Sequence, residues 1–290
     1  MTPNRFKLVG LLVVTLIVTL LFLTPKNVAQ EFTAHKLTFF DPDNFYQSIK
    51  EAENRGEHYT QKVYGGITPH DLFASSLIAN FYSRFGNQKP KTIFLVGPNH
   101  REKGSSPVLT SAMAWETPFG NVEPDTKKIA TLLTLGQVSV DETVLPEDHA
   151  VAGSMPFIKH FLPDSKVVPL LISGHLPFAD MDRLVEALSS VMGESDIVVA
   201  AVDFSHYLRS EEARKNDQVT LLLMQERNYR ALSLSGNDYL DSPNSIILLL
   251  KLMEKKGVSQ LTVLENTNSG DIQKNENIET TSYFTAYFTK

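Results

Sequence analysis

Residues 91–101, KTIFLVGPNHR, decide the fold expected for this chain. The apolar run Ile-Phe-Leu-Val ends abruptly at Gly97, which is followed by Pro98, Asn99 and His100. A short run of apolar and β-branched residues closed by Gly-Pro is typical of a buried strand, and it favours a parallel sheet. Ligands of such sheets bind just beyond the carboxyl ends of the strands. His100 is therefore expected at a binding position.

Several other predicted strands also end near a histidine. The segment QKVYGGIT precedes His70, KVVPLLIS precedes His175, and DIVVAAV precedes Asp203 and His206, while His149 lies in a loop between a strand and a helix. Helical segments alternate with these strands, which predicts an α/β three-layer sandwich with a mainly parallel central sheet. The last segment, TTSYFTAYF, alternates between polar and apolar residues and is expected to be an edge or antiparallel strand.

Composition and charge narrow the possible partners and chemistry. The chain has 290 residues, a net charge of -6 and no basic tract, which disfavours nucleic acid as a partner. It contains no cysteine, and this excludes disulfides, zinc-thiolate sites and a cysteine nucleophile.

The N-terminal residues resemble a signal for membrane insertion or export. Arg5 and Lys7 precede the uncharged run LVGLLVVTLIVTLLFL, near the lower limit for spanning a bilayer. Residues 1–29 are predicted to form a signal anchor, or a cleaved signal peptide as the alternative. The domain would then lie outside the cytoplasm on a single-pass membrane anchor, or be secreted after cleavage. Residues 30–60 are expected to form a connector with solvated His35 and His58, and residues 61–290 one α/β domain.

Histidines gathered at one edge of a sheet favour a metal site. Two histidines and one carboxylate can hold Fe(II) with positions left open, and zinc with a similar set activates a water molecule. Asp148 and Asp203 could serve as ligand, orienting group or base, although both residues are also common in turns. A nucleophilic triad of Ser205, Asp203 and a histidine is an alternative, but Ser205 lacks a Gly-x-Ser-x-Gly elbow.

Five sequence motifs carry a resemblance to a known family. They are GGITPHDLFAS, FLVGPNHRE, WETPFGNVEPD, EDHAVAGSMPFI and VDFSHY, which together with a looser NSGD span about residues 62–290. The chain resembles the Memo-like family, whose microbial members are called AmmeMemoRadiSam system protein B. That resemblance implies a fold like that of class III extradiol dioxygenases, with a metal, usually discussed as iron or copper, held by His70 and His100.

The resemblance also assigns the remaining site residues. It implies His70 and His100 as metal ligands and places the residues of the last two motifs in the same pocket. We expect His206 as a third metal ligand, and His149, Asp148, Asp203 and Ser205 as catalytic residues. Animal members have a cysteine at the position of Ser205, so His206, Asp203 or water is expected to complete the ligand set. The family's second acid after the Glu-His motif is Ala152 here, which removes a possible base.

These observations lead to one expected function and two alternatives. The first is a membrane-anchored, extracytoplasmic metalloprotein, an iron-dependent oxygenase or redox protein, with copper or zinc as other possible divalent metals. The alternatives are a non-catalytic adaptor that binds a peptide or anion in the same pocket, and a metallohydrolase. The expected partners are the membrane, through the N-terminal helix, and a small-molecule or peptide ligand.

Overall fold

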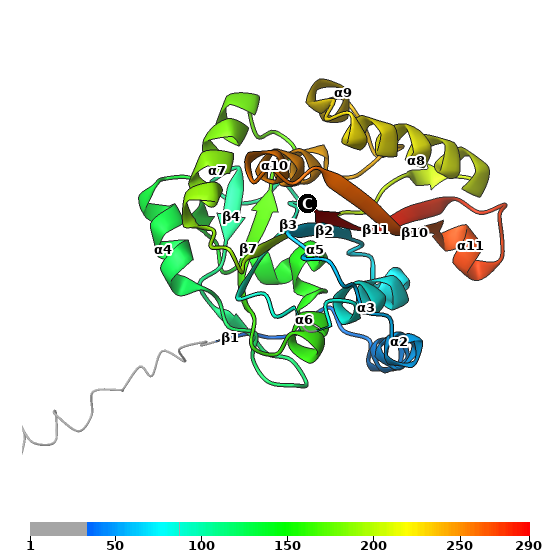
Figure 1. The fold of residues 1–290 in the computed structure, drawn as a ribbon, viewed down its shortest axis with the longest axis horizontal. Helices are drawn as coiled ribbons and strands as arrows, with labels where there is room; N and C mark the ends of the chain where they lie inside the picture. The colour runs from blue at the N-terminus through cyan, green and yellow to red at the C-terminus, as the bar shows by residue number, and fades with distance from the viewer. Residues whose placement is uncertain (1–33, 87) are drawn as a thin grey trace, which may run out of the picture. The chain divides into compact units, whose positions relative to one another are not determined.

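The computed structural model describes residues 34–86 and 88–290. Residues 34–290 form one compact unit of mixed α/β structure, with helices packed against a central sheet (Figure 1). The predicted signal segment, residues 1–29, lies outside the described residues. Among the described residues, no helix combines the length and apolar character needed to cross a membrane.

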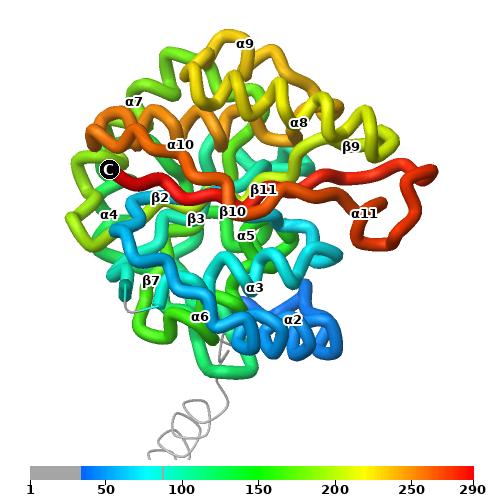
Figure 2. Tube along the Cα trace, turned by 45° about the vertical axis from the view of Figure 1, so that its right-hand side comes forward, coloured from blue at the N-terminus to red at the C-terminus, as the bar shows by residue number. Residues whose placement is uncertain are grey.

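The central sheet combines a parallel core with antiparallel flanks. Its order is β10-β11-β2-β8-β3-β7-β4-β6, and β9 pairs with β11 off this path. The strand pairs β2–β8, β8–β3 and β3–β7 are parallel, whereas the pairs β10–β11, β11–β2 and β7–β4 are antiparallel. The strands are β2 Gly65–Thr68, β3 Thr92–Pro98, β4 Val108–Thr110, β6 Ser139–Val140, β7 Lys166–Ile172, β8 Ile197–Ala201, β9 His206–Leu208, β10 Gln260–Asn268 and β11 Thr280–Thr289. The last strand is antiparallel, as expected, but it lies inside the sheet (Figure 2).

Helices follow most of the strands and cover both faces of the sheet. They are α2 Pro42–Arg55, α3 Ser75–Ser83, α4 Thr126–Thr134, α5 His149–Ala152, α6 Met155–Phe161, α7 Phe178–Val191, α8 Ser210–Gln225, α9 Tyr229–Ser233, α10 Pro243–Lys255 and α11 Ser269–Gln273, with 3-10 turns at Leu72–Ala74 and Leu145–Glu147. The segment that follows β9 forms two helices, α8 and α9, separated at Arg227, which has a positive φ of 57°. The short helix α11 lies between β10 and β11.

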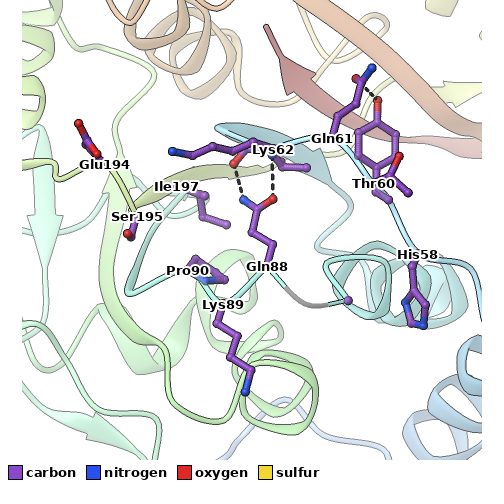
Figure 3. A pocket seen from close by; sticks show the side chains of 13 residues that line it. His58, Thr60, Gln61, Lys62, Gln88, Lys89, Pro90, Glu194, Ser195 and Ile197 are labelled. Carbon is purple, nitrogen blue, oxygen red and sulfur yellow. Dashed lines mark hydrogen bonds between the residues drawn. The ribbon is translucent and has the colours of Figure 1, made fainter.

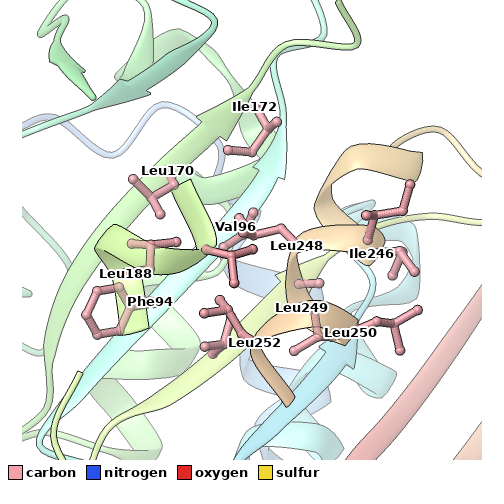
Figure 4. Close-up of a cluster of buried hydrophobic side chains, with 14 of the residues drawn as sticks. Phe94, Val96, Leu170, Ile172, Leu188, Ile246, Leu248, Leu249, Leu250 and Leu252 are labelled. Carbon is pink, nitrogen blue, oxygen red and sulfur yellow. The ribbon is translucent and has the colours of Figure 1, made fainter. Parts of the chain in front are cut away.

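The two faces of the sheet carry separate apolar cores because successive strand side chains point to opposite sides. Phe94 and Val96 of β3 pack against α7 and α10, where the core includes Leu188, Ile246 and Leu249 (Figure 4). Ile93 and Leu95 of the same strand belong to the opposite core, with residues of α3, α5 and α6. Burial on both faces explains why KTIFLVG is apolar without interruption.

The approach of α3 to the sheet depends on a glycine in β2. A Cβ atom at Gly66 would lie 2.6 Å from the ring of Phe81 and 2.9 Å from the carbonyl oxygen of Ala286. Any larger residue would push α3 away from the strand that leads into His70. The Gly65-Gly66 pair therefore helps to set the position of the candidate site.

The first described residues pack into the domain. Ala34–His35 form β1, which pairs in parallel with β5, Ala114–Trp115. His35 is 6% exposed, and its Nε2 lies 2.9 Å from both the Ser111 hydroxyl and a Glu142 carboxylate oxygen. The expectation that His35 is solvated was wrong, because a two-residue strand was too short to recognise in the sequence. His58 is exposed as expected.

Candidate metal centre

His70 lies just beyond β2 and is buried, with 2% of its surface exposed. Its Nδ1 lies 3.0 Å from the carbonyl oxygen of Ala201 at the end of β8, to which it can donate. Its backbone N–H donates to Oδ1 of Asp203 over 3.1 Å. These contacts fix the ring orientation and leave Nε2 directed at the carboxylates of the site.

His100 follows β3 and is oriented by one carboxylate. Its Nδ1 lies 2.8 Å from Oδ1 of Asp148, and its backbone N–H donates to Oδ2 of the same residue over 2.9 Å. Asp148 is itself buried and accepts a bond from the N–H of Ala150 as the N-cap of α5. A metal-binding histidine is commonly held in this way by a carboxylate on its other ring nitrogen.

His149, the first residue of α5, brings a third imidazole to the same place. Its ring stacks on that of His100, with centroids 4.4 Å apart and planes 13° from parallel. Its ring meets His70 edge-on at a centroid distance of 5.0 Å. One ring nitrogen from each of the three histidines lies within 4.8 Å of the others, so the three could hold one ion together.

Two aspartates face the histidines from the other side. Asp203 follows β8, and its Oδ2 lies 3.3 Å from Nε2 of His70. Asp241 lies between α9 and α10, and its Oδ2 is 3.1 Å from Nε2 of His70 and 3.7 Å from Nε2 of His100. The Asp241 N–H donates to the Asp203 carbonyl oxygen over 3.1 Å, which ties the two segments together. His70, Asp203 and Asp241 form a second possible ligand group.

The charges in the cluster strongly shift its protonation. Burial opposes a charge on His70, but the carboxylates of Asp203 and Asp241 outweigh it and raise the pKa of His70 to about 10. Burial likewise opposes a charge on His100, whose pKa is raised to about 9 by its bond to Asp148 and by the nearby carboxylate of Asp241. Burial and the neighbouring positive rings lower the pKa of His149 to about 4, so this ring is neutral at pH 7.

The donor set fits a divalent transition metal. Both oxygens of Asp241 are buried without a hydrogen bond of good geometry from the described residues, and the positive charges of His70 and His100, 3.1 and 3.7 Å from Oδ2, balance the carboxylate in the metal-free site. A metal ion that displaces the two ring protons would balance the same carboxylate. Neighbouring ligands on a metal with bonds of about 2.1 Å lie about 3 Å apart, close to the 3.1 Å between His70 and Asp241. Imidazole and carboxylate donors suit iron, zinc or copper.

Two residues predicted for the site take other contacts. Nδ1 of His206 lies 2.5 Å from the Phe204 carbonyl oxygen, and His206 belongs to neither ligand group. Ser205 is fully buried, and its hydroxyl donates to Asp217 of α8 over 2.9 Å. A third histidine after a strand, His175, is exposed and belongs to neither group. The structure thus brings together His70, His100, His149, Asp148 and Asp203, and adds Asp241.

Asp241 was not a candidate from the sequence because it does not follow a strand. It lies in the segment SGNDYLDSPNS between two helices, where an aspartate is an ordinary turn residue. Backbone hydrogen bonds bring it to the histidines: the Asp241 N–H donates to Asp203, 38 positions earlier in the chain, and the His206 N–H donates to the Asn237 carbonyl oxygen. A local pattern in the sequence does not encode those contacts.

A cavity lies at the edge of the sheet opposite to the histidine and aspartate cluster. It has a volume of about 800 Å³ and is lined by residues that precede β2, β3 and β8, among them Lys62, Gln88 and Glu194 (Figure 3). Gln88 bridges this region by accepting from the N–H of Val63 and donating to its carbonyl oxygen. None of the histidine and aspartate ligand candidates lines it, so size alone does not indicate the functional site.

The fold and the cluster define a class: an α/β protein with a buried histidine–aspartate group, able to bind a metal ion, at the carboxyl ends of its parallel strands. Residues 41–287 match the model of the family described as Memo-like protein, and the chain belongs to this family. It is 27% identical to the MEMO1 family protein PAE0818 of Pyrobaculum aerophilum, over 71% of this chain and 77% of that protein. It is 28% identical to a MEMO1 family protein of Methanosarcina mazei, over 79% and 88% of the two chains.

A solved structure shares the fold at low sequence identity. The crystal structure of the uncharacterized protein JW3007 from Escherichia coli K12 superimposes with a TM-score of 0.52 and 16% identity. The match covers 77% of this chain and 99% of that one. The likeness extends to the fold alone.

Proposed function

We propose that the protein binds one divalent transition metal ion, iron in the first place, through His70, His100 and Asp241. The observation that carries this proposal is the Oδ2 atom of Asp241, which lies within 3.7 Å of both Nε2 atoms and accepts no hydrogen bond from the described residues. In this proposal Asp241 takes the place of His206, whose ring bonds to the Phe204 carbonyl oxygen. Copper and zinc are the other ions compatible with this set.

An oxidoreductase is the activity that this ligand set supports best. Two imidazoles and one carboxylate on one side of Fe(II) leave positions open, and the bound iron would supply oxygen activation there. His149 is neutral at pH 7 and lies against both histidines, so it can accept a hydrogen bond from a substrate. Asp148 orients His100 and would act through it.

A metallohydrolase is the second candidate, because the site holds one more carboxylate than a three-ligand set needs. Burial, reinforced by the charge of Asp241 and opposed by that of His70, raises the pKa of Asp203 to about 7. A carboxylate with that pKa can accept a proton from a water molecule near neutral pH. With zinc in place of iron, Asp203 would serve as the base.

We also propose that the domain is anchored to a membrane and lies outside the cytoplasm. The support is the uncharged run at residues 8–23, which follows Arg5 and Lys7. Cell fractionation combined with protease treatment of intact cells or spheroplasts checks this arrangement. Recovery of the full-length protein in the soluble cytoplasmic fraction would contradict it.

The metal proposal is tested with the full-length chain purified in detergent. The protein is titrated with Fe(II) under anaerobic conditions, with Zn(II) and with Cu(II), and bound metal is measured by mass spectrometry after desalting. We expect one equivalent in the wild type, and at least tenfold weaker binding in the Asp241→Asn and His100→Ala variants. His175→Ala, which changes an exposed histidine outside the cluster, is the matched control and should bind normally.

Two further measurements separate the candidate activities. Oxygen consumption by the Fe(II)-loaded protein supports the oxidoreductase, whereas ester or amide hydrolysis only with Zn(II) supports the hydrolase. A wild-type protein that binds none of the three ions, or a His100→Ala variant that binds as tightly as the wild type, would refute the site.

A further inference from the structure

A cavity of about 330 Å³ opens beside the proposed metal ligands. Its lining includes His100 and Asp241, and also Glu102, Asn237 and Asn244. Its size suits a small ligand. The Asp241 side chain is 9% exposed and faces His70 and His100, so the cavity borders directly on the proposed metal ligands.

Glu102 is held in the cavity wall in a defined orientation. One of its carboxylate oxygens accepts from the N–H of Gly174 over 2.7 Å, and the other accepts from the hydroxyl of Ser173. Its backbone has a φ of 47°, in the left-handed region that side chains other than glycine rarely adopt. The loop after β3 thus places a negative charge two residues from His100.

Outside the proposed metal ligands, the lining of this cavity carries charge of one sign only. Apart from His100 and Asp241, Glu102 is the one charged residue among the described residues of the lining, which include no lysine or arginine. With His100 and Asp241 engaged by a metal ion, Glu102 is left as a carboxylate whose contacts in the cavity wall, Ser173 and Gly174, are neutral. Phosphate and carboxylate groups are bound in proteins chiefly by arginine and lysine, so this lining disfavours an anionic group there.

We propose that the metal site serves a small ligand that carries an amine at the end away from the metal, with Glu102 as the residue that selects the amine. The inference rests on the proposed metal site, because the metal would hold the opposite end of the ligand through oxygen donors. The inference goes beyond the metal site because it specifies a positively charged ligand and the residue, Glu102, that would bind its ammonium group. It also opposes the anion-binding adaptor role, which requires positive charge in the same cavity.

The test uses three hydroxamates that share one metal-binding head and differ only in the tail. They are 3-aminopropanohydroxamate with an ammonium tail, butanohydroxamate with a neutral tail of similar shape, and succinic acid monohydroxamate with a carboxylate tail. Binding to the full-length, Fe(II)-loaded protein is measured anaerobically by calorimetry at pH 7. We expect the ammonium probe to bind at least tenfold more tightly than the carboxylate probe.

Two charge-matched variants assign the preference to a residue. Glu102→Gln keeps acceptors for Ser173 and Gly174 but removes the charge, and it should reduce the preference to less than threefold. Glu194→Gln removes the same charge at the opposite edge of the sheet and should leave the preference unchanged. Butanohydroxamate should bind all three proteins equally.

The outcomes separate the two levels of the proposal. Equal binding of the ammonium and carboxylate tails, with butanohydroxamate still bound, overturns the amine inference and leaves the metal site standing. A preference that survives Glu102→Gln overturns it as well. Failure of butanohydroxamate to bind the wild type overturns the metal site and the amine inference together.

Discussion

Replacing Asp148 with asparagine tests whether a buried carboxylate positions His100 for metal binding. In the wild type one oxygen of Asp148 lies 2.8 Å from Nδ1 of His100, and the other accepts the backbone N–H of His100 over 2.9 Å. The asparagine side chain is nearly the same size and can still cap α5, but it has no charge and only one acceptor oxygen. Its one oxygen can still accept from the ring of His100, but it carries no charge, and an NH2 group replaces the acceptor for the backbone N–H of His100, so the ring is held less firmly with Nε2 directed into the site.

The expected cost follows from the position of Asp148 behind a ligand. Mutation of a group that orients a metal ligand typically weakens metal binding by about 10- to 100-fold, which corresponds to about 1.4–2.7 kcal/mol. The measurement is a metal titration against a competing chelator at pH 9.5. This pH is chosen because the pKa of wild-type His100 is about 9, so protons no longer compete strongly with the metal for His100.

Two controls decide how the result is understood. Glu147→Gln changes the preceding residue, an exposed carboxylate that pairs with Arg101, and should leave metal affinity within twofold of wild type. Circular dichroism of Asp148→Asn should match that of the wild type. A folded Asp148→Asn protein with wild-type affinity at pH 9.5 would refute the orienting role of Asp148.

Three further predictions follow from the structure. The pKa of His70 is about 10 in the folded metal-free protein and about 6.5 when unfolded. Raising the pH from 6.5 to 10 removes this proton, which should lower the free energy of unfolding of the metal-free protein and strengthen metal binding. An affinity independent of pH in chelator competition would contradict this. Ser205→Ala removes a donor to buried Asp217 and should cost about 1–2 kcal/mol in urea unfolding, with metal affinity within twofold of wild type; a tenfold loss of affinity would instead place Ser205 in the metal site. Gly66→Ala should cost about 1–3 kcal/mol because its Cβ would collide with the ring of Phe81, and unchanged stability would show that α3 moves freely.

The part of the site that follows strands could be predicted from the sequence. Parallel strands place their carboxyl ends at one edge, and apolar runs closed by polar residues are visible without any long-range information. His70, His100 and Asp203 were expected on this basis, and the structure places them together. The same rule also selected His175 and His206, because it does not say which way a side chain turns after the strand ends.

The remaining features depend on contacts between distant segments. Asp241 reaches the site through a backbone bond to Asp203, and His35 is buried by pairing β1 with β5, about 80 positions away. Ser205 lies two positions after Asp203 in the sequence, yet its hydroxyl donates to Asp217. In the sequence pattern of α8, Asp217 is not distinguished from the other polar residues of the helix. Such choices are set by packing of the whole domain, which single-segment patterns do not contain.

The place of β11 in the sheet has a consequence for how the protein matures. This strand spans nearly the last residues of the chain, and it pairs with β2, β9 and β10. Until ribosomal synthesis reaches those residues, the strand that leads to His70 has no partner on that side. Because every candidate ligand precedes β11 in the chain, the sheet beside His70 is closed on this side only after all of the ligands have been synthesised.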